Sequence, residues 1–238
     1  MGIIVSRKKS RNLFFSLIYR IQKFIPISNV KKFKLYLNLE WIFDRLSHEL
    51  SYKVYSPSEH PQRISTISFI LSNIGEDDIV LDLGCNQGDI SYYIAEKAKE
   101  VIGVDYNKSA IEKAKQKYKR NNLTFICGEA LEFLKNNNNK FDILILSHIL
   151  EHLDNPQYFI NMFKDYFKFI YIEVPDFEKT YFNLCRKDLN LNLIYSDADH
   201  VSEFDRDELK SLLNSSRLKI LKEDYRFGSQ KFWCTPIK

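Results

Sequence analysis

The chain has 238 residues, the length of a single domain or of one domain with a small cap. Its 45% hydrophobic and 14% aromatic residues exclude global disorder, because so much apolar surface can form a full core. The net charge is +4, but nine of the 35 basic residues and none of the 31 acids fall in the first 35 positions, which leaves 26 bases against 31 acids elsewhere. Such a mildly acidic body argues against a surface built to wrap nucleic acid, so no nucleic acid partner is expected.

The basic N-terminal segment is set apart from the rest. Residues 13–25 have the apolar spacing of a helix, and Pro26 would end it. Two interpretations stay open: the helix lies on an anionic membrane surface, with contacts through residues 7–34, or it packs on the body or on a second subunit. No apolar run is as long as a membrane span and no secretory leader is recognised, so we expect a cytoplasmic protein, docked at the inner membrane face in the first interpretation.

Two further helices are expected before the first strand, over residues 39–50 and 64–74, the second closed by Gly75. We therefore divide the chain into a basic helical extension or cap, residues 1–60, and a main domain, residues 61–238. The oligomeric state stays open.

The main domain alternates strands with helices. Buried strands are expected at 79–83, 101–105, 123–127, 141–146 and 169–174, with helices at 90–99, 109–120 (begun by a serine cap), 130–135 and 156–167. This order is typical of a parallel, doubly wound α/β sheet. The tail, a helix at 205–214 and strands at 218–227 and 231–236 around Gly228 and Ser229, predicts an antiparallel hairpin at one edge.

The loop after the first strand carries the first chemical signal. Residues 82–89 read DLGCNQGD, and the next strand ends in Asp105, whose carboxylate can accept both ribose hydroxyls of an adenosine. A dinucleotide site wants G-x-G-x-x-G, but Asn86 and Asp89 stand where two of those glycines belong, and an acid there repels a phosphate. S-adenosylmethionine (SAM) has no phosphate, so an acidic loop is compatible with it.

This loop resembles motif I of class I SAM-dependent methyltransferases, with Asn86 in place of the middle glycine. Residues 101–107 and 127–130 resemble the second- and third-strand motifs of the family. Residues 141–155 (FDILILSHILEHLDN), 172–176 and 199–204 are similar to the subgroup that modifies small molecules and glycans. The resemblance implies a seven-stranded, Rossmann-like, mostly parallel sheet and SAM as cofactor, with S-adenosylhomocysteine as product.

The resemblance also implies the cofactor contacts. The methionine end would lie against the loop, the ribose on the second strand, the adenine beyond it, and the sulfonium beside the fourth strand. The implied residues are Asp82, Gly84, Cys85, Asn86 and Gly88 for the methionine end, Asp105 for the ribose, Tyr106, Glu129 and Ala130 for the adenine, and Ser147 with His148 for the sulfonium. Arg63 or His60 could reach the SAM carboxylate from above, and residues 47–49 and 58–60 would lie over the pocket.

Methyl transfer to a hydroxyl also needs a general base, for which histidine is the natural side chain. His148, His152 and His200 are the candidates, with Glu151 as a carboxylate alternative. The four cysteines, at 85, 127, 185 and 234, have neither C-x-x-C nor zinc-ligand spacing, so we expect reduced thiols and no metal site.

These patterns predict an O-methyltransferase that acts on a small molecule or on a precursor of a cell-surface polysaccharide such as a capsule. A sugar hydroxyl and a phosphate or phosphoramidate group are both conceivable acceptors. The alternatives are a non-catalytic SAM-binding scaffold, a nucleic acid methyltransferase, although Ser147 and His148 replace the N-P-P-Y-like clamp for a flipped base, and a dehydrogenase.

Overall fold

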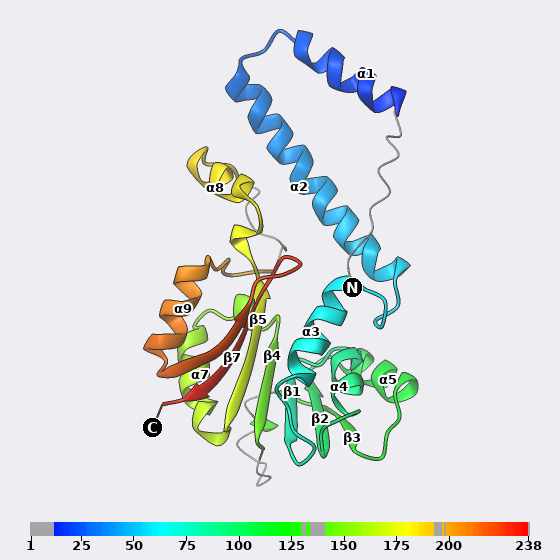
Figure 1. The fold of residues 1–238 in the computed structure, drawn as a ribbon, viewed down its shortest axis with the longest axis vertical. Coiled ribbons are helices and arrows are strands. Elements are labelled where there is room, and N and C mark those ends of the chain that lie inside the picture. Colours follow the sequence, from blue (N-terminus) through cyan, green and yellow to red (C-terminus); the bar gives the residue numbers. More distant parts are fainter. Residues whose placement is uncertain (1–11, 130–131, 134–140, 193–196, 198, 238) are drawn as a thin grey trace.

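The computed structural model describes residues 12–129, 132–133, 141–192, 197 and 199–237. A seven-stranded sheet with the strand order β3-β2-β1-β4-β5-β7-β6 forms its centre (Figure 1). The strands are β1 Ile79–Leu83, β2 Glu100–Asp105, β3 Leu123–Cys127, β4 Ile143–Ser147, β5 Phe169–Pro175, β6 Leu218–Asp224 and β7 Ser229–Pro236. Strands β1 to β5 pair in parallel, whereas β7 is antiparallel to both β5 and β6, which confirms the predicted doubly wound sheet and its terminal hairpin.

Helices cover both faces of the sheet. The α-helices are α1 Leu13–Ile21, α2 Asn29–Val54, α3 Pro61–Leu71, α4 Asp89–Ile94, α5 Lys108–Lys117, α7 Pro156–Phe163, α8 Tyr181–Asp188 and α9 Arg206–Ser215. Short 3-10 helices lie at η1 Gln22–Phe24, η2 Leu150–His152, η3 Lys164–Tyr166 and η4 Phe177–Lys179. Apolar side chains of α3 and α4 form the core on one face of the sheet, and those of α7 and α9 form the core on the other. With helices on both faces, the central strands are buried on both sides, so their sequences are continuously apolar rather than alternating.

Several predicted helix limits are wrong. The helix expected at 90–99 already ends at Ile94, because the amide of Asn122 donates to the carbonyls of Ala95 and Ala98, both at 2.9 Å, and holds them in turns. Helix α5 begins after Asn107, whose side chain accepts from the Ala110 amide at 3.1 Å, and not after a serine cap. The helix expected at 130–135 falls almost entirely outside the described residues, and α8 was not predicted.

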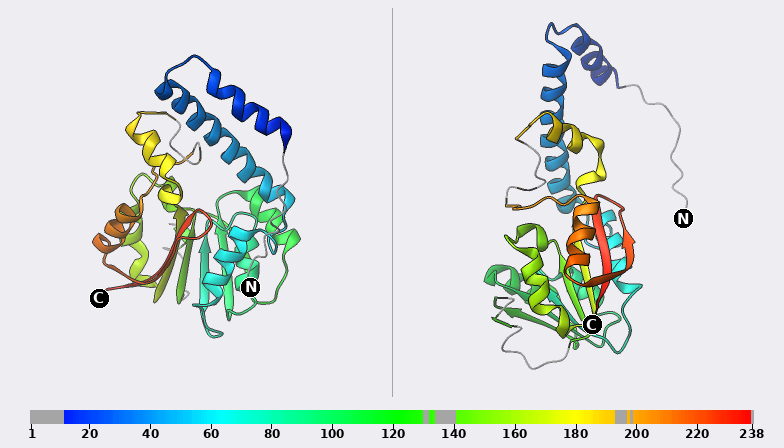
Figure 2. Two further views of the ribbon diagram at one scale, coloured as in Figure 1. Left: turned by 45° about the horizontal axis from the view of Figure 1, so that its top comes forward. Right: turned by 90° about the vertical axis from the view of Figure 1, so that its left-hand side faces the viewer.

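The expected helix at 39–50 is the centre of a much longer one. Helix α2 begins after its cap Ser28 and rises from the sheet, with α8 beside it (Figure 2). Arg186 of α8 joins the two helices: it is 1% exposed, donates to the Leu37 carbonyl at 2.9 Å and pairs with Glu40. Two further bonds fix α2, from Lys34 to the Leu189 carbonyl at 2.9 Å and from Lys179 to Asp44 at 2.6 Å. A buried, fully charged guanidinium needs such partners, so α2 is docked on the body at a defined position.

Helix α1 buries no residue, although its sequence is apolar around most of its circumference. Its large exposed side chains include Leu13, Phe14, Phe15 and Leu17. Among the described residues, no helix is long and apolar enough to cross a membrane. An exposed apolar surface of this kind indicates an interaction site on α1.

The loop from β1 to α4 depends on Gly88, which yields a stability test. Its φ is +78°, and a Cβ there would lie 2.4 Å from Cζ of Phe125, so Gly88→Ala adds both backbone strain and overlap. We expect it to lower the free energy of unfolding by about 1–3 kcal/mol in a urea titration. The matched control is Gly128→Ala, because a Cβ on Gly128 meets nothing within 4 Å, so this variant should stay within about 0.5 kcal/mol of wild type. Equal losses in both variants would contradict this explanation.

Candidate active site

The two loops that build the site leave the sheet side by side. In the strand order, the chain reverses direction across the sheet between β1 and β4, which pair with Leu83 opposite Leu146. Ligands of open α/β sheets bind at the carboxyl ends of the strands at such a switch point. Gly84 has a φ of +73°, and a Cβ there would overlap the side chain of Ile149 in the loop after β4. The absence of that Cβ lets the two loops touch.

The loop after β1 tolerates Asn86 in place of glycine. Asn86 has a φ of 49°, in the left-handed region that asparagine enters more readily than most residues. Its backbone N–H donates to Oδ2 of Asp105 at 2.8 Å, and the N–H of Asn107 donates to Oδ1 at the same distance. Two backbone donors thus fix the orientation of the Asp105 carboxylate at the end of β2, while each oxygen keeps acceptor capacity.

Asp82 is the buried acid of the site. Its side chain is 2% exposed, and the Ser91 hydroxyl donates to it at 2.5 Å. Burial raises the pKa of Asp82 to about 7, the hydrogen bond from Ser91 opposes this, and the charge of Asp105 adds to it. Burial likewise raises the pKa of the neighbouring Cys85 thiol far above its usual range, so this thiol stays protonated. No disulfide involves Cys85, Cys127, Cys185 or Cys234, all of which are described and free.

A cavity of about 570 Å³, the larger cavity, lies over these loops. Seven of the predicted site residues line it: Asp82, Gly84, Cys85, Asn86, Ser147, His148 and His152. Six others do not, namely Gly88, Asp105, Tyr106, Glu129, Glu151 and His200, and Ala130 lies outside the described residues. Tyr106 is 75% exposed beside the Asp105 carboxylate. Most residues predicted for the methionine and sulfonium end therefore line the larger cavity, whereas the predicted ribose contact Asp105 is buried outside its lining, and the predicted adenine contacts Tyr106 and Glu129 are exposed.

An ion pair between two charged side chains stabilises the wall of the larger cavity. Arg63 lines the cavity and pairs with Asp89, which also binds Tyr118 and accepts from Lys117 at 3.0 Å. Burial would raise the pKa of Asp89, but Tyr118, Arg63 and Lys117 outweigh it and lower that pKa. His60 is buried, stacks on Tyr52 at 4.2 Å and lines neither cavity, so Arg63 is the one of the two proposed side chains that reaches the site.

Glu173 is a buried carboxylate that sequence reasoning did not assign to the site. It lies at the end of β5, lines the larger cavity, and accepts from Thr66 at 2.8 Å, Tyr171 at 2.7 Å and Ser147 at 3.2 Å. Its position near the carboxyl end of a predicted parallel strand was the available signal in the sequence, and the structure pairs it with Ser147.

A second cavity of about 390 Å³, the smaller cavity, adjoins the first. Helix α2 supplies one wall through Glu40, Asp44, Arg45 and His48, and the segments around Lys179 and His200 supply the others. Tyr52, Gln62, His148 and His152 line both cavities. The two cavities thus share a wall, and His48 and Glu49, from the segment predicted to lie over the pocket, line the smaller cavity only.

His148 and Glu151 form a pair in the loop after β4. The Nδ1–H of His148 donates to Oε1 of Glu151 at 3.0 Å, and Glu151 is fully buried. Burial acts to lower the pKa of His148, but the hydrogen bond and charge of Glu151, with the charge of Glu173, outweigh it and raise the pKa to about 9. At neutral pH this imidazole adds a positive charge to the shared wall.

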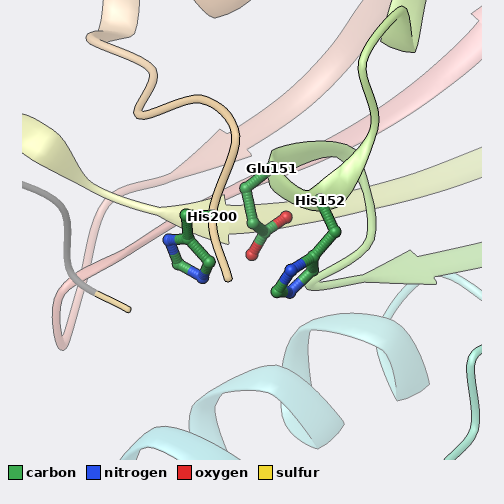
Figure 3. A group of neighbouring side chains, drawn as sticks. All are labelled: Glu151, His152 and His200. Carbon is green, nitrogen blue, oxygen red and sulfur yellow. The ribbon is translucent and has the colours of Figure 1, made fainter. Parts of the chain in front are cut away.

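The structure brings Glu151, His152 and His200 together, and we call them the Glu-His-His cluster (Figure 3). The two rings meet edge to face with centroids 4.8 Å apart. Nδ1 of His152 donates to the carbonyl of Asp199 at 3.2 Å, and Nδ1 of His200 donates to Oε1 of Glu203 at 2.9 Å. All four candidate base residues therefore lie close together, and two of them, His148 and His152, line both cavities.

Residues 74–218 match the model of a family described as a methyltransferase domain, which is more than half of the chain. The chain belongs to this family. Together with the seven-stranded fold, this identifies a class I SAM-dependent methyltransferase. The comparisons do not define a subgroup.

Solved structures share the fold at low sequence identity. Magnesium protoporphyrin IX methyltransferase from Synechocystis with bound S-adenosylhomocysteine is 15% identical, with 95% of each chain covered and a TM-score of 0.56. A SAM-dependent methyltransferase from Archaeoglobus fulgidus is 19% identical, covering 72% of this chain and 91% of its own, with a TM-score of 0.55. The N-methyltransferase NodS from Bradyrhizobium japonicum is 16% identical, covering 74% and 96%, with a TM-score of 0.55. One is named for a porphyrin acceptor and another only as an N-methyltransferase, and the shared fold does not by itself identify an acceptor.

The curated relatives match over a short stretch only. An uncharacterized RNA methyltransferase from Leptospira interrogans is 38% identical over 91 residues, which are 37% of this chain and 23% of that protein. One from Clostridium tetani is 37% identical over 84 residues, 33% of this chain and 18% of that protein. The chain thus spans less than a quarter of the length of these relatives.

The raised pKa of Asp82 gives a pH prediction. The folded protein holds this proton up to about pH 7, whereas the unfolded chain releases it near pH 4, so Asp82 lowers stability progressively as pH rises through that window. Asp82→Asn keeps the acceptor for Ser91 without the charge, so its free energy of unfolding should rise relative to that of wild type as pH rises from 4 to 7.

Asp142→Asn is a control with the opposite sign. Burial would raise the pKa of Asp142, but Lys168 and the Ile79 amide lower it. This variant should therefore lose stability relative to wild type as pH rises through the acid range. Urea unfolding at several pH values measures both, and parallel profiles would refute the assignment.

Proposed function

We propose that this enzyme transfers the methyl group of SAM to an oxygen of a small polar molecule, with a sugar precursor of a cell-surface polysaccharide such as a capsule as the first substrate class. A sugar hydroxyl and a phosphate or phosphoramidate group both belong to this class. The observation that carries the proposal is the wall that the two cavities share. A donor in the larger cavity and an acceptor in the smaller one would meet at His148 and His152.

The larger cavity fits SAM in size and in charge. Its volume of about 570 Å³ lies within the range of small-molecule sites. Arg63 offers a cation for the amino acid carboxylate, Asp82 an acid for the ammonium group, and Asp105 acceptors for the ribose hydroxyls. An acid whose pKa burial has raised to about 7 gains most from a cationic ligand, because the ligand restores its charge. SAM supplies an electrophilic methyl group, and the protein supplies position and the exclusion of water.

The smaller cavity fits a polar, hydroxyl-rich acceptor. Charged side chains of both signs line it, among them Asp44, Arg45, Asp176, Lys179 and Arg186. Such groups recognise hydroxyls and phosphates by directed hydrogen bonds, whereas an apolar acceptor would leave them without ligand partners. We assign the removal of the acceptor proton to the Glu-His-His cluster, since His152 and His200 both face this cavity.

A nucleic acid acceptor is the second candidate, because the curated relatives are named RNA methyltransferases. The wall that α2 forms over the smaller cavity favours a small acceptor over a polymer.

The third hypothesis is a non-catalytic SAM-binding scaffold, and detection of turnover would exclude it.

The N-terminal region supports a location near membrane-linked glycans. The apolar side chains of α1 are exposed, and basic residues such as Lys23, Lys31 and Lys32 accompany them. This combination is typical of a helix on an anionic membrane surface. We infer that residues 1–60 form a cap and that the enzyme works in the cytoplasm, with contacts through residues 7–34 to the inner membrane face.

The ribose contact is tested by Asp105→Ala. Loss of charge-assisted hydrogen bonds should weaken SAM binding by about 1–3 kcal/mol in calorimetric titration. The control Asp142→Ala removes an acid at the amino end of β4, whereas the site lies at the carboxyl ends of the strands. This variant should leave SAM affinity unchanged. An unaltered affinity in Asp105→Ala would exclude the ribose assignment.

The acceptor class is tested with SAM labelled in its methyl group. Nucleotide-linked sugars, sugar phosphates and transcribed RNA are offered in parallel, and we expect label in the sugar compounds and none in RNA. Label in RNA alone would replace the proposed acceptor with the second candidate.

With a labelled acceptor in hand, Lys179→Met tests the smaller cavity. Lys179 lines this cavity and pairs with Asp44 of α2 at 2.6 Å. Its loss should raise the KM for the acceptor about tenfold, the effect of one charged hydrogen bond, with SAM affinity unchanged. Lys168→Met is matched to it, because Lys168 pairs with Asp142 at the same distance but away from both cavities.

A further inference from the structure

The Glu-His-His cluster has the composition of a metal site. We propose that Glu151, His152 and His200 bind one divalent transition-metal ion, of which Zn²⁺ is the type, at the floor of the smaller cavity. Two imidazoles and one carboxylate are the protein ligands of many catalytic metal centres, which keep a further position for water or substrate. The site itself follows from the described residues alone, whereas its role in catalysis rests on the proposed function.

The ligand atoms already stand at the spacing of a coordination shell. One donor atom each from Glu151, His152 and His200 lies within 4.8 Å of the other two. Ligands about 2.0–2.2 Å from a zinc ion lie roughly 3–4 Å apart in a tetrahedral shell, so small rotations of the side chains close the site. Figure 3 shows the carboxylate of Glu151 between the two rings. Asp197 and Asp199 form an overlapping group with His200, so additional oxygen ligands are at hand.

The partners of the two histidines are those that metal ligands use. The Nδ1–H of His152 donates to a backbone carbonyl, that of Asp199, and the Nδ1–H of His200 donates to the carboxylate of Glu203. Such bonds fix the tautomer in which Nε2 carries the lone pair, and they orient the ring toward an ion. No spacing motif in the sequence indicates this arrangement, because 48 positions separate His152 from His200.

Glu151 supplies the independent observation. Its side chain is fully buried, and its Oε2 has no hydrogen-bond partner among the described residues, while Oε1 accepts from His148. A buried carboxylate oxygen without a partner costs free energy comparable to a lost charged hydrogen bond. A cation beside the two imidazoles would satisfy it. His148 then holds the carboxylate from the other side.

The location gives the ion a use. His152 lines both cavities and His200 lines the smaller one, so an ion between them would face the acceptor where it meets the donor. A divalent ion draws in a hydroxyl or phosphate oxygen and lowers the pKa of a hydroxyl, which then releases its proton to water. The ion would thus orient the acceptor, and the cluster would act on the acceptor proton through the bound ion in place of a free imidazole base.

Metal binding is measured first and without any acceptor. The full chain, dialysed against chelator, is titrated with Co²⁺, a coloured stand-in for Zn²⁺, and visible absorption is recorded. We expect one equivalent of Co²⁺ with bands that Zn²⁺ abolishes by displacement. His152→Ala and His200→Ala should each weaken binding by more than about 100-fold, since loss of a ligand costs at least as much as loss of its hydrogen-bonding partner. Glu203→Gln should weaken it by about 10-fold or more.

The matched control is His48→Ala, a histidine of the same cavity that lies outside the cluster. It should bind Co²⁺ as wild type does. Absence of Co²⁺ binding to the wild type at millimolar concentration would overturn the proposal, as would Co²⁺ binding that survives in both cluster variants. Calorimetry with SAM on every variant reports whether the site is still folded.

The same measurements separate this inference from the proposed function. Stoichiometric Co²⁺ binding with SAM binding, but no label in any sugar compound, would retain the metal site and remove the acceptor class. SAM binding and sugar methylation without Co²⁺ binding would retain the acceptor class and reject the metal site.

Discussion

The parallel pairing of β1 with β4 sets the geometry of the candidate active site. These strands are neighbours in space although β2 and β3 lie between them in the chain, so the loop after Leu83 and the loop after Ser147 leave the sheet at one level. The missing side chain of Gly84 allows contact with Ile149 across the gap. Under the proposed function, this contact holds the donor side and the acceptor side of the site within reach of each other.

The site has one buried carboxylate on each of its two sides. Asp82 sits on one side, with a pKa that burial raises to about 7, and Glu151 sits on the other, with one oxygen bound to His148. Each of these acids lowers the stability of the folded protein when it is ionised, because a buried negative charge is unfavourable until a cation binds beside it. The site is therefore organised to gain stability from positively charged ligands, and SAM and a divalent ion both have that character.

The sequence predicted the elements governed by local rules. The limits of β1 and β3 and the presence of the terminal hairpin were correct, because turn residues at their ends define them, whereas the hairpin strands end at other residues than expected. Helix ends that depend on distant partners were wrong, as where Asn122 ends α4. Sequence reasoning also named the histidines and Glu151 individually, but it expected no metal site, because ligand spacing along the chain carries no trace of the contact between His152 and His200. The path of α2 depends on the buried Arg186, for which no local pattern exists.

The roof of the smaller cavity comes from a different part of the chain than the cofactor loops. Residues 74–218 carry the family match, whereas α2 lies entirely before it and is held to the body by polar contacts that include those of Lys34, Arg45 and Arg186. Under the proposed function, changes at Glu40, Asp44 or Arg45 on α2 would therefore alter which acceptor fits, whereas Tyr52 of the same helix lines both cavities and links them. Acceptor preference would then vary mainly through a segment that the methyltransferase family model does not cover.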